Sequence, residues 1–539
     1  MRESFGDTSP QPSPHFAPPT SQNAEREKRS PRVLRILALP FLLVWFAVFQ
    51  SAAAQPSCVV LQPAAFSNYV AHFDDMEDEN VTNFVPNAKS WEWLQKEIPF
   101  FACPDREIEE LYYFRWWSFR KHLEQTAHGF VFTEFLTRPV PVSSAVGHQL
   151  LEGRWLRDQN FLDDYICSWL RNTNGPQSLH KYSNWLEDAV YQRYLVTSDR
   201  RFVVQLLPDL VRDYHQWEDE HLSTNGLFWQ YDVRDAMEES ISGSRTNKNL
   251  RPTINSYMFG NARAIAAIAR LAGKQSLAGE FEAKAGRLKK LVQKRLWNPE
   301  AGFFEVVRDN GKFSDAREEL GFIPWYFELP DHEAKYAAAW AQLSDPGGFA
   351  APYGLTTAER RHPQFRTHGY GHCEWDGAVW PFATSQTLGA LANFLRDYDS
   401  SAVTPRDYFD SFLTYSHSQH AGGRPYIGEY LDETTGQWIN GKDGRSRFYN
   451  HSTFADLVIT GVVGLVPRPD DVVEIWPMLP EGTWKWFCLD GVSYHDHVFT
   501  IIWDQDGTRY HRGSGLIVLA DGKEIARSHK LAKLTGELP

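Results

Sequence analysis

The chain has 539 residues, and a hydrophobic share of 42% is enough for a large core spread over several domain-sized units. Its formal net charge of −13 argues against an extended nucleic-acid partner, which would require a basic surface. Aromatic residues make up 14% of the chain, a share that suits clefts for sugar rings as well as large cores.

The N-terminal segment has the pattern of an export signal. Residues 1–33 are rich in Ser, Pro and charged side chains and are predicted to be disordered. An apolar run, 36–49, ends just before the small residues Ala52 and Ala54, so 34–54 is interpreted as a signal peptide cut after Ala54. An uncleaved type II anchor is the alternative, which the short apolar run disfavours. We therefore expect a secreted protein with no stable membrane partner unless this segment stays uncleaved.

Cysteines and glycosylation sequons add to this expectation. No two of the five cysteines lie close together, so we predict no zinc site of the usual spacing, no other metal and no cofactor. One or two disulfides are possible, and because the number of cysteines is odd, at least one cysteine would be free or would pair with another chain. Asn80 and Asn450 begin N-glycosylation sequons, which predict a glycoprotein, although the second lies in a stretch that we expect to be functional.

From about residue 104 the hydrophobic pattern follows the helical period, with few strands between the helices. Tight turns alternate with much longer connections that carry Trp, Tyr, Asp, Glu and His. This alternation predicts a closed ring of helical hairpins whose long loops gather on one rim. A plain helical solenoid would show a repeat of fixed period, and we find none. The predicted helices are 105–121, 146–170, 182–195, 201–221, 252–273, 277–296, 316–327, 332–343, 379–398, 405–420 and 452–463.

The tail from about residue 470 changes character. Its short pieces alternate or are rich in β-branched residues, and turns are marked at Gly507 and Gly522. We predict a small antiparallel β domain here. The expected division is an N-terminal extension over 55–89, a helical catalytic domain over 90–468 and a sandwich-like β domain over 469–539.

One acidic stretch, Trp229–Gly260, stands out among the long connections. It holds Asp232, Asp235, Glu238 and Glu239 within eight positions, ahead of a strongly helical pattern. Loops held by a rigid scaffold often carry the chemistry of a protein. The alternative is that these acids cap the following helix and complement its dipole. A single helix start needs only one cap, so the whole cluster favours a functional role.

A second acidic loop contains Glu429, between Gly428 and Tyr430. Hydrolysis of a glycosidic bond needs two carboxyl groups, one protonated to donate to the leaving oxygen and one ionised to activate water or attack. Aromatic surroundings can push the two pKa values apart by desolvation. Glu238 and Glu429 are far apart in sequence, but a ring of hairpins would bring both loops to one rim.

The stretch 426–436, Y-I-G-E-Y-L-D-E-T-T-G, resembles the E-Y-x-x-x-T-G loop that holds the catalytic base in six-hairpin (α/α)6 glycosidases. This chain has one residue more before the final Gly. The superfamily includes trehalases, family 63 processing α-glucosidases and mannosylglycerate hydrolases. Their general acid lies in a Gly-(Leu/Met/Trp)-Asp motif, to which Ala236-Met237-Glu238 corresponds here. The stretch 375–381 looks like the Trp-Arg-Gly-Pro-Val-Trp loop of the same group, with Asp376 where Arg is common.

This resemblance, which covers about residues 90–468, implies a mainly α-helical (α/α)6 toroid of helical hairpins with a small C-terminal antiparallel β domain. It implies hydrolysis with inversion, with Glu238 as general acid and Glu429 as general base. Asp235 stays open as the acid, because Glu238 departs from the usual Asp.

Further residues are candidates for substrate contacts, because Arg and aromatic side chains can clamp hydroxyls and stack on sugar rings. The alternative is that the helical aromatics belong to the core and that an Asn at a helix start is a cap. The candidates are Trp117, Arg154, Trp155, Asp158, Tyr231, Asp232, Asn255, Trp375, Asp376, Trp380 and Tyr430.

The sequence thus predicts a secreted glycoside hydrolase, on a branch away from the trehalases, that acts on the ends of a plant or microbial glycan. An α-glycosidase and a β-L-arabinofuranosidase-like enzyme both fit. A polysaccharide lyase or a sugar epimerase on the same toroid is the first alternative, since fold does not fix function. The negative charge and the paired acids argue against a lyase. A non-catalytic carbohydrate-binding protein is the third interpretation, which would need the aromatics but not the carboxyl pair.

Overall fold

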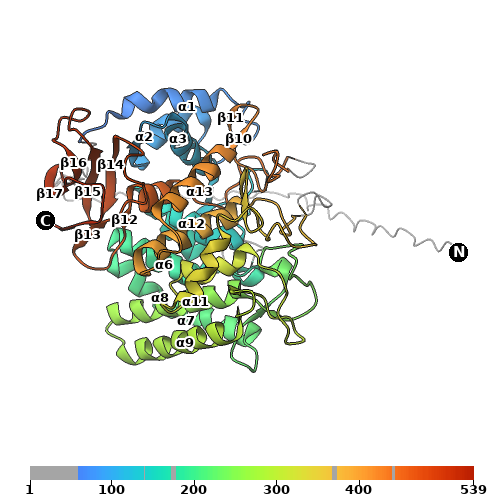
Figure 1. Ribbon diagram of the computed structural model, residues 1–539. Coiled ribbons are helices and arrows are strands. Elements are labelled where there is room, and N and C mark those ends of the chain that lie inside the picture. The colour runs from blue at the N-terminus through green and yellow to red at the C-terminus, as the bar shows by residue number, and fades with distance from the viewer. Residues whose placement is uncertain (1–58, 139, 172–177, 367–372, 440–443) are drawn as a thin grey trace, which may run out of the picture. The chain divides into compact units, whose positions relative to one another are not determined.

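The computed structural model describes residues 59–138, 140–171, 178–366, 373–439 and 444–539 (Figure 1). The predicted disordered tail, 1–33, and the predicted signal segment, 34–54, lie outside the described residues, so both stay predictions. Over the described ranges, none of the helices combines the length and the apolar character that a membrane crossing requires.

A closed ring of inner helices forms the centre of the fold. Its members are α4 (Val146–Gly153), α6 (Leu186–Thr197), α8 (Pro252–Leu271), α10 (Ile323–Tyr326), α12 (Pro381–Asp397) and α14 (Ala455–Leu457), which continues as the π-helical η8 (Val458–Val463). Each contacts the next, and α14 contacts α4, which closes the ring. α8 buries Ala262, Ala266 and Ala269, small residues that let neighbouring helices approach closely. Pro252 and Pro381 are the first residues of their helices. The N–H that proline lacks would have no partner within the helix at this position, so no hydrogen bond is lost.

A second set of helices surrounds this ring. They are α3 (Arg106–Lys121), α5 (Asn160–Leu170), α7 (Arg200–His221), α9 (Gln275–Arg295), α11 (Ala334–Ala337) and α13 (Pro405–Ser418). On α9 the buried residues Ala278, Phe281, Ala285 and Leu288 recur every three or four positions, so one face packs inward and the other meets solvent. The chain is therefore an (α/α)6 toroid, which confirms the predicted fold class.

Two short helices that precede α3 in the chain cover it. Helix α1 (Ser67–Asp74) and helix α2 (Ser90–Glu97) both pack on α3, which explains why α3 is buried over most of its length.

Four predicted helices differ from the structure. The predicted helix 316–327 consists of the 3-10 helix η6 (Glu319–Phe322) and the short α10, and the predicted helix 452–463 consists of the short α14 and the π-helical η8. The predicted helix 146–170 is divided into α4 and α5, because the segment between them turns. Asp158 fixes this turn by accepting a hydrogen bond from the Asn160 N–H at 3.1 Å, while its own N–H donates to Glu97 at 2.9 Å. The predicted helix 332–343 consists of the short α11 followed by the 3-10 helix η7 (Ala338–Gln342).

The C-terminal region forms the predicted antiparallel β structure. Its larger sheet has five strands in the order β1-β14-β15-β16-β17, and its smaller sheet has three in the order β12-β13-β18. The strands are β1 (Phe100–Ala102), β14 (Trp486–Tyr494), β15 (His497–Asp504), β16 (Gly515–Ala520), β17 (Lys523–Ser528), β12 (Leu465–Val466), β13 (Val472–Ile475) and β18 (Leu534–Glu537). β1 precedes α3 in the chain, so the larger sheet joins segments from before and after the toroid. The predicted boundaries 55–89, 90–468 and 469–539 remain predictions.

Short hairpins and 3-10 turns shape the long loops, which in Figure 1 lie at the end of the toroid away from the five-stranded sheet. The paired strands are β2 (Leu123–Thr126) with β3 (Gly129–Phe132), β4 (Trp229–Gln230) with β5 (Asn249–Leu250), β6 (Trp297–Asn298) with β7 (Phe303–Phe304), β8 (Ala350–Ala351) with β9 (Gly354–Leu355), and β10 (His420–Ala421) with β11 (Arg424–Pro425). The remaining 3-10 turns are η1 (Pro63–Phe66), η2 (Asn87–Lys89), η3 (Ser143–Ala145), η4 (Leu179–Lys181), η5 (Asp232–Arg234) and η6 (Glu319–Phe322).

Candidate active site

A cavity of about 610 Å³ is built from loops that lead into the inner helices. Glu134 lies ahead of α4, Tyr182 ahead of α6, Glu238 ahead of α8, Trp375 ahead of α12 and Glu429 ahead of α14. The loops that precede these inner helices all line the same cavity, so the N-terminal ends of the helices lie on one rim of the ring. The two acidic loops singled out in the sequence therefore share one cavity.

Glu238 is presented by a tightly constrained loop. Ala236 and Glu239 on either side of it adopt left-handed backbone angles, with φ of 57° and 61°, which non-glycine residues rarely take. The Glu238 carbonyl accepts a hydrogen bond from the Trp375 N–H at 3.1 Å. Burial raises the pKa of the Glu238 carboxyl to about 7, and the charge of Glu429 adds to the rise. Glu238 is therefore suited to hold a proton near neutral pH.

Glu429 has the opposite surroundings. Its carboxylate accepts hydrogen bonds from Ser446 Oγ at 2.8 Å and from the Tyr449 hydroxyl at 3.3 Å, and Arg445 Nη2 lies 3.6 Å away. An ionised carboxylate only accepts hydrogen bonds, so this set of donors fits the charged form. The two carboxyls of the pair therefore lie in different surroundings.

A third carboxyl, Glu134, lines the same cavity, and the sequence analysis missed it. Burial raises its pKa to about 8, and the negative charge of Glu429 contributes. The Tyr449 hydroxyl hydrogen-bonds with Glu134 and also donates to Glu429, so it links the two acids. Glu134 follows Thr133 at the end of the short strand β3, and a single acid in this position carries no pattern that distinguishes it from a surface residue.

Aromatic rings form one wall of the cavity. The Trp375 and Trp380 rings stack with centroids 4.4 Å apart, and Trp380 stacks on Tyr430 at 4.7 Å and 7° between planes. Trp375 and Trp380 line the cavity, while Tyr430 lies behind them as a buried support. Flat apolar faces of this kind suit the apolar face of a sugar ring.

Cations line the cavity as well, and sequence reasoning did not identify them. Arg138, Lys181 and Arg445 all line it. The guanidinium group of Arg138 lies 5.5 Å from the centroid of the Phe135 ring, and that of Arg445 lies 5.6 Å from it.

A thiol, that of Cys373, also lines the cavity. Burial and the nearby carboxylates raise its pKa, so this thiol is held in its neutral form.

Asp235, the alternative acid, lies outside the lining of this cavity. Its carboxylate forms an ion pair with Arg251 at 2.6 Å, and both side chains are fully buried. The pair ties the acidic loop to the start of α8. This contact gives Asp235 a structural role beside the candidate acid Glu238.

Other predicted substrate contacts also lie away from the cavity lining. Arg154 pairs with Asp456 at 2.8 Å, and the Trp155 indole N–H donates to the same carboxylate at 2.7 Å. The buried Trp117 donates to Asp74 at 2.7 Å. These side chains stabilise the packing of helices.

The remaining predicted contacts fix loops. Asp158 holds the turn before α5, and Asn255 exchanges hydrogen bonds with the Phe228 backbone, both at 2.8 Å. Asp232 accepts from the Val233 N–H at 2.7 Å, and Asp376 pairs with Arg366 at 2.6 Å.

Tyr231 packs against Trp229 with ring centroids 5.2 Å apart and does not line the cavity.

Within the described part of the chain, no group of three or more His, Cys, Asp or Glu side chains is placed to hold a metal ion.

Comparisons with known proteins agree with this geometry. Residues 138–452 match the model of the mannosylglycerate hydrolase MGH1-like glycoside hydrolase domain, and residues 468–526 match that of the glycosyl hydrolase family 65 C-terminal domain. A solved structure named sialidase is similar at 50% identity and a TM-score of 0.87, covering 89% of this chain and 45% of that one.

More distant relatives share parts of the chain. The GH63 mannosylglycerate hydrolase from Thermus thermophilus, solved with glucose, is 16% identical with a TM-score of 0.51, covering 65% of this chain and 99% of that one, and so supports the fold alone. The periplasmic trehalase of Salmonella paratyphi C is 26% identical over 215 residues, 38% of this chain and 35% of the trehalase. The chain spans less than half the length of this trehalase and of the sialidase. The resemblance predicted from the sequence is confirmed, and the chain belongs to the mannosylglycerate hydrolase MGH1-like glycoside hydrolase domain family.

Proposed function

We propose that the protein is an exo-acting glycosidase in which Glu238 is the general acid and Glu429 the general base. One observation carries the proposal: the two carboxyls, from loops far apart in the sequence, line one cavity in opposite electrostatic surroundings. Environments that favour the protonated form of one carboxyl and the ionised form of the other mark the acid and the base of a glycosidase.

In the proposed reaction, the glycosidic oxygen lies next to Glu238, which donates its proton as the bond to the anomeric carbon breaks. Glu429 takes a proton from a water molecule that attacks the opposite face of the sugar, and the product anomer is inverted. Ser446, Tyr449 and Arg445 orient the Glu429 carboxylate. Inversion rests on the likeness to the six-hairpin glycosidases.

The shape of the cavity supports action on chain ends. A cavity of about 610 Å³ falls in the size range of sites for small ligands, and loops surround it. Trp375 and Trp380 would stack on the terminal sugar. We propose a secreted enzyme that acts on a plant or microbial glycan, in keeping with the export pattern of residues 34–54 and with relatives named periplasmic trehalases.

A second candidate function is hydrolysis of a glycoside that carries a carboxylate. Arg138, Lys181 and Arg445 on the cavity wall would attract an anionic sugar or aglycone. The 50% identity to a chain named sialidase is in keeping with an acidic sugar.

Hydrolysis of a panel of p-nitrophenyl glycosides tests the proposal, with neutral sugars, uronic acids and a sialic acid in one series. Wild type, Glu238→Gln and Glu429→Gln are compared, and the product anomer is followed by NMR. We expect one sugar to be cleaved with inversion, and Glu429→Gln to lose this activity. Glu238→Gln should lose less on these substrates, because p-nitrophenolate leaves with little protonation, and should fail on the alkyl glycoside of the same sugar. Retention of configuration would exclude the proposed roles. Cleavage of uronate polymers alone, with an unsaturated product, would indicate a lyase. Sugar binding without any turnover would indicate a binding protein.

A further inference from the structure

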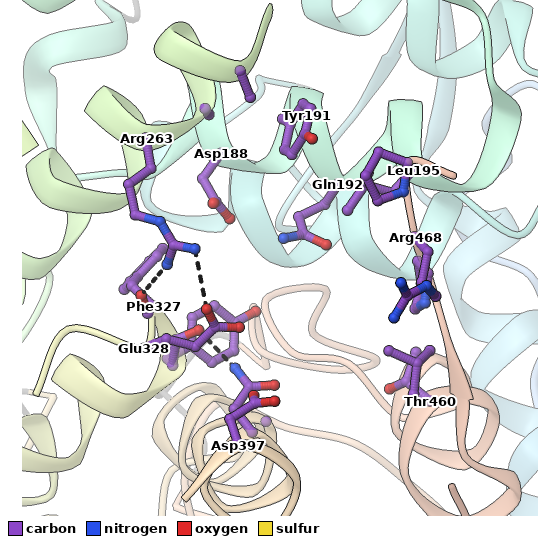
Figure 2. A pocket seen from close by; sticks show the side chains of 18 of the residues that line it. Asp188, Tyr191, Gln192, Leu195, Arg263, Phe327, Glu328, Asp397, Thr460 and Arg468 are labelled. Carbon is purple, nitrogen blue, oxygen red and sulfur yellow. Dashed lines mark hydrogen bonds and ion pairs between the residues drawn. The ribbon is translucent and has the colours of Figure 1, made fainter. Parts of the chain in front are cut away.

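A second and larger cavity, of about 720 Å³, lies at the other end of the inner helices. Its lining comes from the side of α6 that bears Asp188 and Gln192, from the C-terminal halves of α8 and α12, and from the C-terminal β region, including Trp476. Figure 2 shows this cavity, with Asp188 and Gln192 extending from α6 into the open space. None of these residues lines the candidate active site.

A layer of aromatic side chains separates the two cavities. The Trp185 ring lies 6.2 Å from that of Tyr326 and 6.3 Å from that of Phe382, between ring centroids. Tyr326 lines the second cavity, and Phe382 lines the candidate active site. The fully buried Trp185 therefore fills the space between them, and the two cavities are distinct sites.

The cations around the second cavity already have partners. Arg263 pairs with Glu328 at 3.1 Å and donates to the Phe327 carbonyl at 2.7 Å, as the dashed lines in Figure 2 show. Arg154 pairs with Asp456 at 2.8 Å, and Arg468 pairs with Glu474 at 2.9 Å. These pairs neutralise most of the positive charge of the wall. Arg396 is the exception, since it donates to the Thr460 carbonyl and has no carboxylate at ion-pair distance among the described residues.

The inner surface offers both donors and acceptors. Asp188 and Gln192 lie one helical turn apart on α6 and hydrogen-bond with each other, and Gln192 Oε1 also accepts from Arg154 at 3.2 Å. Among the described side chains, Asp188 has no ion-pair partner within 4.0 Å. Burial raises the pKa of Asp188 to about 7, so near neutral pH this carboxyl both donates and accepts. The buried Nε of Arg396 also lacks a hydrogen-bond partner among the described residues.

Aromatic faces complete the lining. Tyr191, Tyr326 and Trp476 contribute rings, and Lys533 lies over the Trp476 ring at 4.3 Å from its centroid. A hydroxyl both donates and accepts a hydrogen bond, so a polyhydroxylated ring matches a wall of mixed polar groups and aromatic faces without carrying a charge.

We propose that this cavity is a second, non-catalytic site that binds a neutral mono- or disaccharide. The proposal does not depend on the function proposed for the active site, because it rests on other residues. Bound sugar would contact Asp188 and Gln192 through its hydroxyls and Trp476 through its ring.

Fluorine NMR of the full chain labelled with 5-fluorotryptophan tests this proposal. Trp476 reports on the second cavity and Trp380 on the active site, and the variants Trp476→Phe and Trp380→Phe assign the two resonances. Glucose, mannose and trehalose are titrated, with inorganic phosphate and glucuronate as charged probes. We expect at least one neutral sugar to shift the Trp476 resonance saturably, and the charged probes to leave it unchanged.

Variants locate the sugar. Gln192→Ala and Asp188→Asn should each weaken the Trp476 response about tenfold, the loss expected from one hydrogen bond to a half-buried polar group. The Trp380 response should not change. Glu282→Gln, at an exposed rim position paired with Arg270, is the matched control and should have no effect. A Trp476 resonance that no neutral sugar moves in the wild type would overturn the proposal, as would a response to phosphate or glucuronate alone.

Discussion

The two ends of the toroid use the same residue types in different ways. In the candidate active site, neither Glu134 nor Glu238 has a cation at ion-pair distance among the described residues, and burial raises their pKa values to about 8 and about 7. In the opposite cavity, Asp456, Glu328 and Glu474 each form an ion pair with an arginine. Among these carboxyls, the two with raised pKa values have no cation at ion-pair distance, and the three paired with an arginine hold elements of the fold together.

The same contrast occurs within one loop. Asp235 and Glu238 are three positions apart, yet Asp235 is locked to Arg251 and Glu238 faces the cavity. Substitutions at these positions should therefore affect different properties, catalysis in one case and stability in the other.

The largest effect is expected at the proposed acid and base. Glu238→Gln and Glu429→Gln should each lower kcat by about 10²–10⁴-fold, the usual contribution of a general acid or base. Steady-state kinetics measures this loss on an alkyl glycoside of the sugar found in the glycoside panel, because an alkoxide leaving group needs the proton of the acid. The control is Glu239→Gln, because Glu239 is a half-exposed neighbour paired with Arg245 and should keep kcat within about twofold. Equal losses in all three variants would show that the loop as a whole, and not the carboxyl of Glu238, is responsible.

Asp235→Asn should act on stability. Breaking a buried ion pair leaves Arg251 without its counter-charge and costs about 3–5 kcal/mol of unfolding free energy. Chemical denaturation measures this loss, and the kcat of the folded fraction should stay within a few-fold of wild type. An Asp235→Asn variant with unchanged stability and a kcat as low as that of Glu238→Gln would assign the acid role to Asp235.

Glu134 should make stability depend on pH. Its folded pKa of about 8 lies above its unfolded value, so its carboxyl favours folding fully only below the unfolded pKa and this contribution is lost as the pH rises through about 8. Between pH 4 and pH 9, the free energy of unfolding of Glu134→Gln should therefore rise relative to that of wild type by about 5 kcal/mol. Denaturation at the two pH values measures the change, and an identical difference at both would contradict it.

The ionisation of Glu238 should cause the decrease of kcat/KM at high pH. A general acid with a pKa of about 7 loses its proton above that pH, so kcat/KM should fall about tenfold per pH unit at higher pH. Pre-steady-state or steady-state pH profiles check the position of this decrease. A plateau that continues to pH 9 would show that Glu238 does not titrate as the acid.

The helical ring was largely predictable from local patterns. Residues that end and begin helices can be recognised in a sequence. Ser198 takes a left-handed conformation at the end of α6, and Asp199 caps α7 by accepting a hydrogen bond from the Phe202 N–H at 2.9 Å. The division of 146–170 was not predicted, because the partner that fixes the turn, Glu97, lies 61 residues away.

The site was predictable in part. The loops of Glu238 and Glu429 carry recognisable motifs, and they line one cavity. Trp117 and Trp155 could not be placed, because core and sugar-binding tryptophans have the same local sequence and their partners, Asp74 and Asp456, lie 43 and 301 positions away. Glu134 was missed because its significance comes from Tyr449 and Glu429, which only the fold brings to it.

Leaving-group dependence tests the assigned roles of Glu238 and Glu429 most directly. A glycosyl fluoride needs no protonation to leave, whereas an alkyl glycoside does. We predict that Glu238→Gln hydrolyses the fluoride of the preferred sugar at close to the wild-type rate but loses the alkyl glycoside, and that Glu429→Gln loses both. If Glu238→Gln failed equally on both substrates, or Glu429→Gln retained the fluoride, the assignment of acid and base would be contradicted.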